Sequence, residues 1–219
     1  MDKTQVINAI EKQKLIVIVR GVEKDKLIPL TQALFDGGIR LMELTYSADG
    51  TVSDDQTAEC IKLLVNHFKG EMLIGAGTVL TEKQVELTHE AGGKFIISPD
   101  TYPEVIKATV KLGMVSIPGA LTPTEIQSAM RNGADFVKLF PITNLGASYL
   151  KAIKAPLKNV KMLAVGGIDQ NNLNEYFQAG ACGFGIGANI ANKKMIDEND
   201  WKGISSLAKK YITAIRELS

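Results

Sequence analysis

Short aliphatic runs recur along this sequence, and their spacing restricts the folds that the chain can adopt. Each run is long enough for a β-strand and too short for a buried helix. Segments of helical period separate the runs, and glycines such as Gly113, Gly133 and Gly180 stand where a left-handed helix cap is needed just before the next run. We therefore predict eight strands, at residues 15–20, 39–45, 72–76, 94–98, 114–117, 136–140, 161–165 and 183–187.

Eight alternating strand and helix units favour a closed parallel barrel. Over 219 residues they average about 27 residues per unit, a compact version of the (β/α)8 TIM barrel, with an open doubly wound sheet as the alternative. Helices are expected at residues 26–35, 57–68, 82–90, 103–112, 124–131, 147–153, 172–178 and 201–217. No linker divides the chain, so one domain over residues 1–219 is expected.

Charge and hydropathy exclude several classes of partner. The formal net charge of +1 argues against electrostatic binding to nucleic acid. The longest aliphatic run, residues 15–19, is far shorter than a membrane span, and the amino-terminal residues lack the pattern of a signal peptide. We therefore expect a cytoplasmic protein without a membrane partner.

Metal, disulfide and nucleotide sites also lack support. Cys60 and Cys182 are far apart and are expected to be buried, and His67 and His89 are expected at the surface, so these residues assemble no metal site. The Gly75-Ala76-Gly77 segment follows a strand but lacks the full dinucleotide-binding fingerprint.

Three charged residues interrupt strands that should be apolar on both faces. Arg20, Glu43 and Lys138 each continue an alternating aliphatic or aromatic face, at the carboxyl end of a predicted strand. Active sites of these barrels lie at that end. A buried salt bridge is the structural alternative, although such pairs often give no net stability over apolar packing.

Lys138 is the most informative of the three. Phe136, Val137, Leu139 and Phe140 surround its ammonium with apolar side chains, and desolvation lowers the pKa of a lysine. A neutral lysine amine is the nucleophile in Schiff-base chemistry.

Further motifs accompany these residues from Ile16 to about Asn189. They are Val17-Ile18-Val19-Arg20, Glu43-Leu44-Thr45, Gly75-Ala76-Gly77-Thr78-Val79, Ile97-Ser98-Pro99, Pro118-Gly119, Thr122-Pro123-Thr124-Glu125, Lys138-Leu139-Phe140-Pro141 and Gly166-Gly167-Ile168. In this order and spacing, the chain resembles the family of 2-keto-3-deoxy-6-phosphogluconate (KDPG) aldolase and 4-hydroxy-2-oxoglutarate (KHG) aldolase.

The resemblance implies a homotrimeric class I aldolase that cleaves a 2-keto-4-hydroxy acid to pyruvate and an aldehyde, with no metal and no organic cofactor. It implies that Lys138 forms the Schiff base and that Glu43 is the general acid and base. Arg20 is implied to bind the substrate carboxylate, because Tyr46-Ser47-Ala48 lacks the arginine that other members carry there. The remaining implied pocket residues are Thr78, Pro99 and Phe140.

The chain departs from the family pattern at its last two strands. The resemblance implies that backbone amides of Gly166, Gly167 and Gly187 bind a phosphate, but Val165 and Ala188 replace two hydroxyl residues of that site. We therefore expect a weaker preference for phosphorylated substrates than the family shows. A barrel that binds a small phosphorylated or carboxylated metabolite without turnover, and another phosphate-handling barrel enzyme such as an isomerase, are the alternatives.

Overall fold

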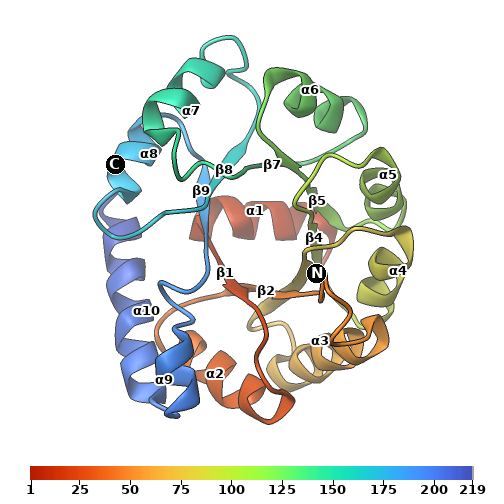
Figure 1. Ribbon diagram of the computed structural model, residues 1–219, viewed down its shortest axis with the longest axis vertical. Coiled ribbons are helices and arrows are strands. Elements are labelled where there is room, and N and C mark those ends of the chain that lie inside the picture. The colour runs from red at the N-terminus through yellow and green to blue at the C-terminus, as the bar shows by residue number, and fades with distance from the viewer. Residues whose placement is uncertain (219) are drawn as a thin grey trace.

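The computed structural model describes residues 1–218, in which nine parallel strands form a nearly closed barrel (Figure 1). The strand order is β5-β4-β3-β2-β1-β9-β8-β7-β6, and its two end strands are successive in the chain. The strands are β1 Leu15–Val19, β2 Leu41–Thr45, β3 Leu73–Gly77, β4 Phe95–Ile97, β5 Val115–Ile117, β6 Gly119–Ala120, β7 Val137–Leu139, β8 Met162–Val165 and β9 Gly183–Ile186. The predicted barrel is confirmed.

Helices surround the strands on the outside (Figure 1). They are α2 Lys24–Asp36, α3 Asp54–Phe68, α4 Glu82–Glu90, α5 Pro103–Lys111, α6 Pro123–Arg131, α7 Gly146–Lys154, α8 Leu173–Gln178, α9 Lys193–Asp197 and α10 Trp201–Arg216. Side chains of Ser53, Thr81 and Thr122 cap α3, α4 and α6 by accepting a backbone N–H bond, so the chain turns sharply from each preceding loop into its helix.

The barrel closes at a short strand that was not predicted. The fifth predicted strand, residues 114–117, corresponds to β5, and β6 follows it after Pro118. Pro118 separates β5, which pairs with β4, from β6, which pairs with β7. Proline has no N–H to donate to a ladder, but the Pro118 carbonyl accepts a bond of 2.9 Å from the Lys138 amide. Pro118 thus links the two halves beside the lysine of β7.

A helix that the sequence analysis did not predict, α1 Lys3–Gln13, closes the amino end of the barrel. It crosses the centre of the ring of strands in Figure 1. Val6 and Ile10 belong to the core inside the barrel, while Lys3 pairs with Asp135 at 2.9 Å. Helix α1 thus covers the amino end of the interior, opposite the carboxyl ends of the strands.

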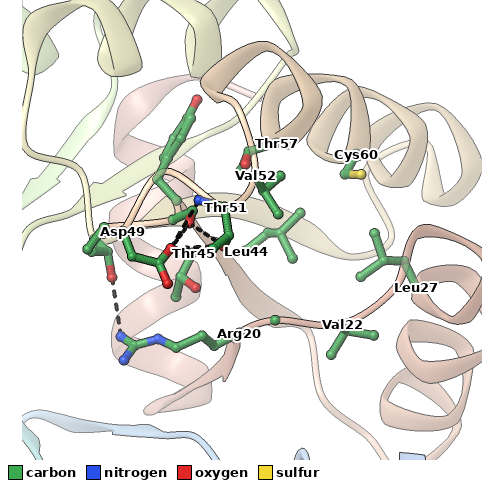
Figure 2. Close-up of a pocket in the computed structure, with 15 residues that line it drawn as sticks. Arg20, Val22, Leu27, Leu44, Thr45, Asp49, Thr51, Val52, Thr57 and Cys60 are labelled. Atoms are coloured by element: carbon green, nitrogen blue, oxygen red, sulfur yellow. Dashed lines mark hydrogen bonds between the residues drawn. The ribbon is translucent and has the colours of Figure 1, made fainter.

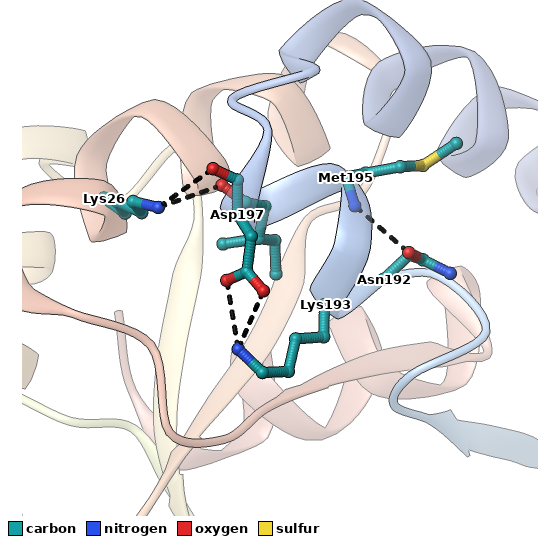
Figure 3. A network of polar contacts seen from close by, with 6 residues as sticks. Lys26, Asn192, Lys193, Met195 and Asp197 are labelled. Atoms are coloured by element: carbon teal, nitrogen blue, oxygen red, sulfur yellow. Dashed lines mark hydrogen bonds and ion pairs between the residues drawn. The ribbon is translucent and has the colours of Figure 1, made fainter.

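The segment after β9 is held by a contact between two helices, shown in Figure 3. Lys26 Nζ of α2 donates to the carbonyl oxygens of Ile196 and Asp197 at 3.3 and 3.4 Å. These carbonyls end α9, where a lysine satisfies groups that the helix leaves without partners. The contact joins the end of α9, the helix after β9, to α2, the helix after β1.

Several expectations about individual side chains can now be compared with the structure. His67 and His89 are exposed, as predicted, whereas the free thiols of Cys60 and Cys182 are half-buried rather than fully buried. Within residues 1–218 there is no cluster of three or more His, Cys, Asp or Glu side chains able to hold a metal. The same residues include no helix long and apolar enough to cross a membrane.

Candidate active site

Two charged side chains enter the apolar interior of the barrel. Glu43 of β2 and Lys138 of β7 are 1% and 7% exposed, and both line a cavity of about 10 Å³, enough for about one water molecule. The other lining residues are aliphatic or glycine: Ile16, Ile18, Ile97, Ile117, Leu163, Val165 and Gly185. The strand alternation therefore placed both residues on the correct face.

The surroundings of Lys138 favour its neutral amine. Burial lowers the pKa of Lys138 and the positive charge of Arg20 lowers it further, while the Glu43 carboxylate opposes the shift. Lys138 Nζ also lies 4.5 Å from the centre of the Phe140 ring. The side chain is thus a buried amine next to an aromatic face and an acidic group.

Glu43 is a carboxyl group that can both donate and accept a proton near neutral pH. Burial raises its pKa from 4.5 to about 7, against the opposing effect of the Lys138 and Arg20 charges. Its Oε2 atom is buried and has no hydrogen-bond partner among the described residues. Gly77 leaves the space for this carboxyl, because a Cβ there would overlap Glu43 Oε1. A nucleophilic amine and a proton-transfer group therefore share one water-poor space.

Arg20 and Thr78 meet at the mouth of the barrel. Arg20 Nη2 donates to Thr78 Oγ1 at 3.2 Å, from the loops that follow β1 and β3. Thr78 has a φ of 54°, a left-handed conformation that is rare for a β-branched residue and often occurs at functional sites. Both residues line a pocket of about 380 Å³ that extends toward α2 and α3 (Figure 2). This pair can bind an anion beside the Lys138 cavity.

Phe140 and Pro99, the other two residues predicted to line the pocket, lie in different places. Phe140 contacts Lys138, as described, whereas Pro99 is half-buried after β4 and lines neither of these two pockets. A Cβ at Gly119 would overlap the Pro99 carbonyl oxygen, so the Pro99 turn packs closely against β6. The structure therefore associates Pro99 with the barrel closure more directly than with either pocket.

Gly166, Gly167 and Gly187 lie in the loops after β8 and β9. Gly166 and Gly167 have φ values of 102° and 68°, and no hydrogen bond to another group within residues 1–218 engages their amides. A Cβ at Gly167 would come within 2.9 Å of Thr143 Cγ2. Successive free amides in such a turn form a concave anion site.

Val165 does not belong to this anion site, which corrects the grouping made from the sequence. Its side chain lies in the barrel interior and lines the Lys138 cavity, because successive side chains of a strand point to opposite faces. The valine that replaces a hydroxyl residue at position 165 therefore changes the barrel interior. Of the two replacements, only Ala188 lies in the exposed loop after β9.

Two residues that the sequence analysis did not assign to the site also contribute. Gly77 gives Glu43 its space, as described, and Thr45 of β2 lines the pocket with Arg20 and Thr78. Thr45 follows Glu43 by two residues, so the strand alternation already placed it on the same face. Whether Thr45 takes part in binding depends on whether its hydroxyl already has a hydrogen-bond partner, which the sequence does not show.

Comparisons with known proteins agree with this arrangement. A family model described as KDPG and KHG aldolase matches residues 6–207. The 2-dehydro-3-deoxy-6-phosphogalactonate aldolase of Escherichia coli is 32% identical over 206 residues, which cover 94% of this chain and 98% of the relative.

Solved structures show the same fold. The KDPG aldolase of Legionella pneumophila, crystallised with pyruvate captured as a covalent carbinolamine intermediate, has a TM-score of 0.81 and 30% identity, covering 93% of this chain and 96% of that one. A cube-shaped cage designed by fusing symmetric oligomeric domains has a TM-score of 0.85 and 32% identity, covering 94% and 73%. On the family model and the E. coli relative together, the chain belongs to the KDPG and KHG aldolase family.

Proposed function

We propose that this protein is a class I aldolase that reversibly cleaves a 2-keto-4-hydroxy acid to pyruvate and an aldehyde. The observation that carries the proposal is the buried amine of Lys138 beside the buried carboxyl of Glu43 in an apolar cavity. Family membership supports the same reaction. We expect no metal or organic cofactor, because a protonated imine can itself accept the electron pair released by carbon-carbon cleavage.

In the proposed reaction, Lys138 Nζ attacks the keto carbon and forms a carbinolamine. Glu43 protonates the departing hydroxyl, so water leaves and a protonated imine forms. The Glu43 carboxylate then takes the proton of the C4 hydroxyl as the C3–C4 bond breaks. The aldehyde departs, the electron pair remains in an enamine, and protonation at C3 followed by hydrolysis releases pyruvate and restores the Lys138 amine.

Different residues are proposed to bind the two ends of the substrate. Arg20 and Thr78 bind the carboxylate, for which a guanidinium fork is suited. Phe140 packs against the keto acid beside Lys138. Pro99, which lines neither pocket, is assigned to the substrate site only by the family resemblance. The amides of Gly166, Gly167 and Gly187 bind an anionic group at the far end of the substrate.

Borohydride trapping tests the mechanism. Pyruvate and borohydride should add a reduced pyruvyl group to Lys138, located by mass spectrometry of peptides. Lys138→Arg, which keeps the charge but supplies no nucleophile, should remain unlabelled. An unlabelled wild type, or equal labelling of the variant, would contradict the proposed chemistry.

The substrate is identified by comparing kcat/KM on KDPG, on the 6-phosphogalactonate compound for which the E. coli relative is named, and on 4-hydroxy-2-oxoglutarate. Binding of these acids without turnover would favour the alternative, a barrel that only binds a metabolite.

We further propose that the protein acts as a homotrimer in the cytoplasm. Three large apolar side chains, Val52, Leu80 and Tyr102, are exposed on successive loops at the carboxyl end of the barrel, and exposed apolar groups on one face are typical of subunit contacts. The similarity to a component of a cage made from symmetric oligomers supports association. Light scattering that finds only monomer would refute it.

A further inference from the structure

Two buried side-chain atoms of the described residues have no hydrogen-bond partner, Glu43 Oε2 and Thr45 Oγ1. The proposed chemistry uses the first atom but gives no role to the second. Thr45 is only 8% exposed, and an unpaired buried hydroxyl destabilises a protein. Valine would have the same shape without this cost, so the hydroxyl at Thr45 needs an explanation.

The location of Thr45 points to a ligand. Thr45 is the last residue of β2, and its Cα pairs with that of Gly77, the residue before Thr78. Arg20, Thr45 and Thr78 all line the pocket of about 380 Å³, and Figure 2 shows Thr45 and Arg20 in the same part of its wall. Thr45, at the end of β2, therefore lines the same pocket as Arg20 and Thr78, which lie in the loops after the two strands that flank β2.

The hydrogen-bonding capacity of these groups suits a carboxylate. The guanidinium of Arg20 only donates, and Thr78 Oγ1 accepts one of its bonds, so the Thr78 proton remains available to a ligand. The Thr45 hydroxyl adds another donor. Asp49 also lines this pocket, and its carboxylate is ionised because bonds accepted from Ser47 and Thr51 hold its pKa down at about 2. These bonds are local to the loop, so Asp49 does not use the Arg20, Thr45 or Thr78 donors. A carboxylate, with two oxygens and several lone pairs, can use every donor present.

We propose that the Thr45 hydroxyl is a third donor to the substrate carboxylate, alongside Arg20 and Thr78. The proposal rests on the proposed function, because the ligand is the carboxylate of pyruvate or of the 2-keto-4-hydroxy acid. Ligand binding gives the buried hydroxyl the partner that it lacks in the free protein.

The test measures the pyruvate concentration that gives half-maximal borohydride labelling. Thr45→Val removes the hydroxyl and keeps the shape, so this concentration should rise about tenfold. Labelling at saturating pyruvate should stay complete, because Lys138 is unchanged, and the midpoint of thermal unfolding should stay the same or rise. Thr45→Ser keeps a hydroxyl and should restore a concentration near that of the wild type.

Two controls separate this role from a general effect on packing. Thr109 is buried as well, but its hydroxyl donates to the Val105 carbonyl at 2.7 Å in α5, so Thr109→Val should lower stability without changing the pyruvate dependence. Acetone has a ketone carbonyl but a methyl group in place of the carboxylate, and its weaker labelling should be equal in wild type and Thr45→Val.

The outcomes distinguish the two proposals. A labelled wild type together with an unchanged pyruvate dependence in Thr45→Val overturns the role of Thr45 and leaves the aldolase chemistry standing. An equal loss with acetone also overturns it, because the hydroxyl would then act elsewhere than on the carboxylate. An unlabelled wild type overturns both.

Discussion

Replacing Glu43 by glutamine should stabilise the protein, and by an amount that grows with pH. The wild-type carboxyl is buried in an apolar cavity, where its charged form is unfavourable. Its pKa is higher in the folded state than in the unfolded state, so the folded state binds this proton more tightly. The contribution of Glu43 to stability is therefore present below about pH 4.5 and is lost as pH rises to about 7.

The magnitude follows from the two pKa values. A rise from 4.5 to about 7 is about 2.5 units, which at 1.36 kcal/mol per unit corresponds to about 3 kcal/mol. Glutamine has nearly the same shape and does not ionise. The free energy of unfolding of Glu43→Gln, relative to wild type, should thus be about 3 kcal/mol higher at pH 8 than at pH 4.5. For a domain of this size, that is a shift of roughly 6–12 °C in the unfolding midpoint.

Denaturant unfolding of both proteins at pH 4.5, 6, 7 and 8 measures this difference. Glu86→Gln, which removes an exposed carboxylate from α4, is the control and should show no comparable trend. Borohydride labelling of Glu43→Gln should slow markedly at the same time, because the group that moves protons is gone. A stability difference that is constant across this pH range would show that the Glu43 carboxyl does not carry the raised pKa on which the proposed proton transfer depends.

Three further substitutions test the placement of individual side chains. Val165→Thr puts a hydroxyl into the apolar Lys138 cavity, so denaturant unfolding should show a loss of about 1–3 kcal/mol, while the ratio of kcat/KM for phosphorylated and unphosphorylated substrates stays within about threefold. Gly77→Ala adds a Cβ that overlaps the Glu43 carboxyl, and kcat should fall by about tenfold or more with near-native circular dichroism. Lys26→Met removes the two bonds to the end of α9, so stability should fall by about 1 kcal/mol with kcat unchanged.

Much of the fold could be predicted because the strands of a parallel barrel are covered on both faces. Such strands appear as short aliphatic runs, and each charged residue within them is conspicuous. This is why Arg20, Glu43 and Lys138 could be recognised together, and why the structure places them around the same end of the barrel.

The parts that were missed depend on local chemistry or on contacts distant in sequence. The predicted fifth strand ended correctly before Pro118, and the missed element is β6 Gly119–Ala120, which has only two residues and contains no aliphatic run. Helix α1 has apolar residues one turn apart at Val6 and Ile10, together with a capping box at Asp2, but its polar character concealed the apolar stripe that closes the barrel. Thr45 Oγ1 has no hydrogen-bond partner because of the groups that surround it in the fold. The residue type alone does not predict this.

Val165 shows how a motif can be assigned to the wrong site when it is taken as a single unit. Val165 and Gly166 are adjacent, yet the valine is the last residue of β8 and faces Lys138, while the glycine begins a turn with free amides. A valine in place of a hydroxyl residue at position 165 therefore changes the polarity of the cavity that Lys138 lines. Only Ala188 remains as a missing hydroxyl at the far end of the substrate, and backbone amides can supply the donors there. The expected weakening of phosphate binding is accordingly about half of what two missing hydroxyls imply.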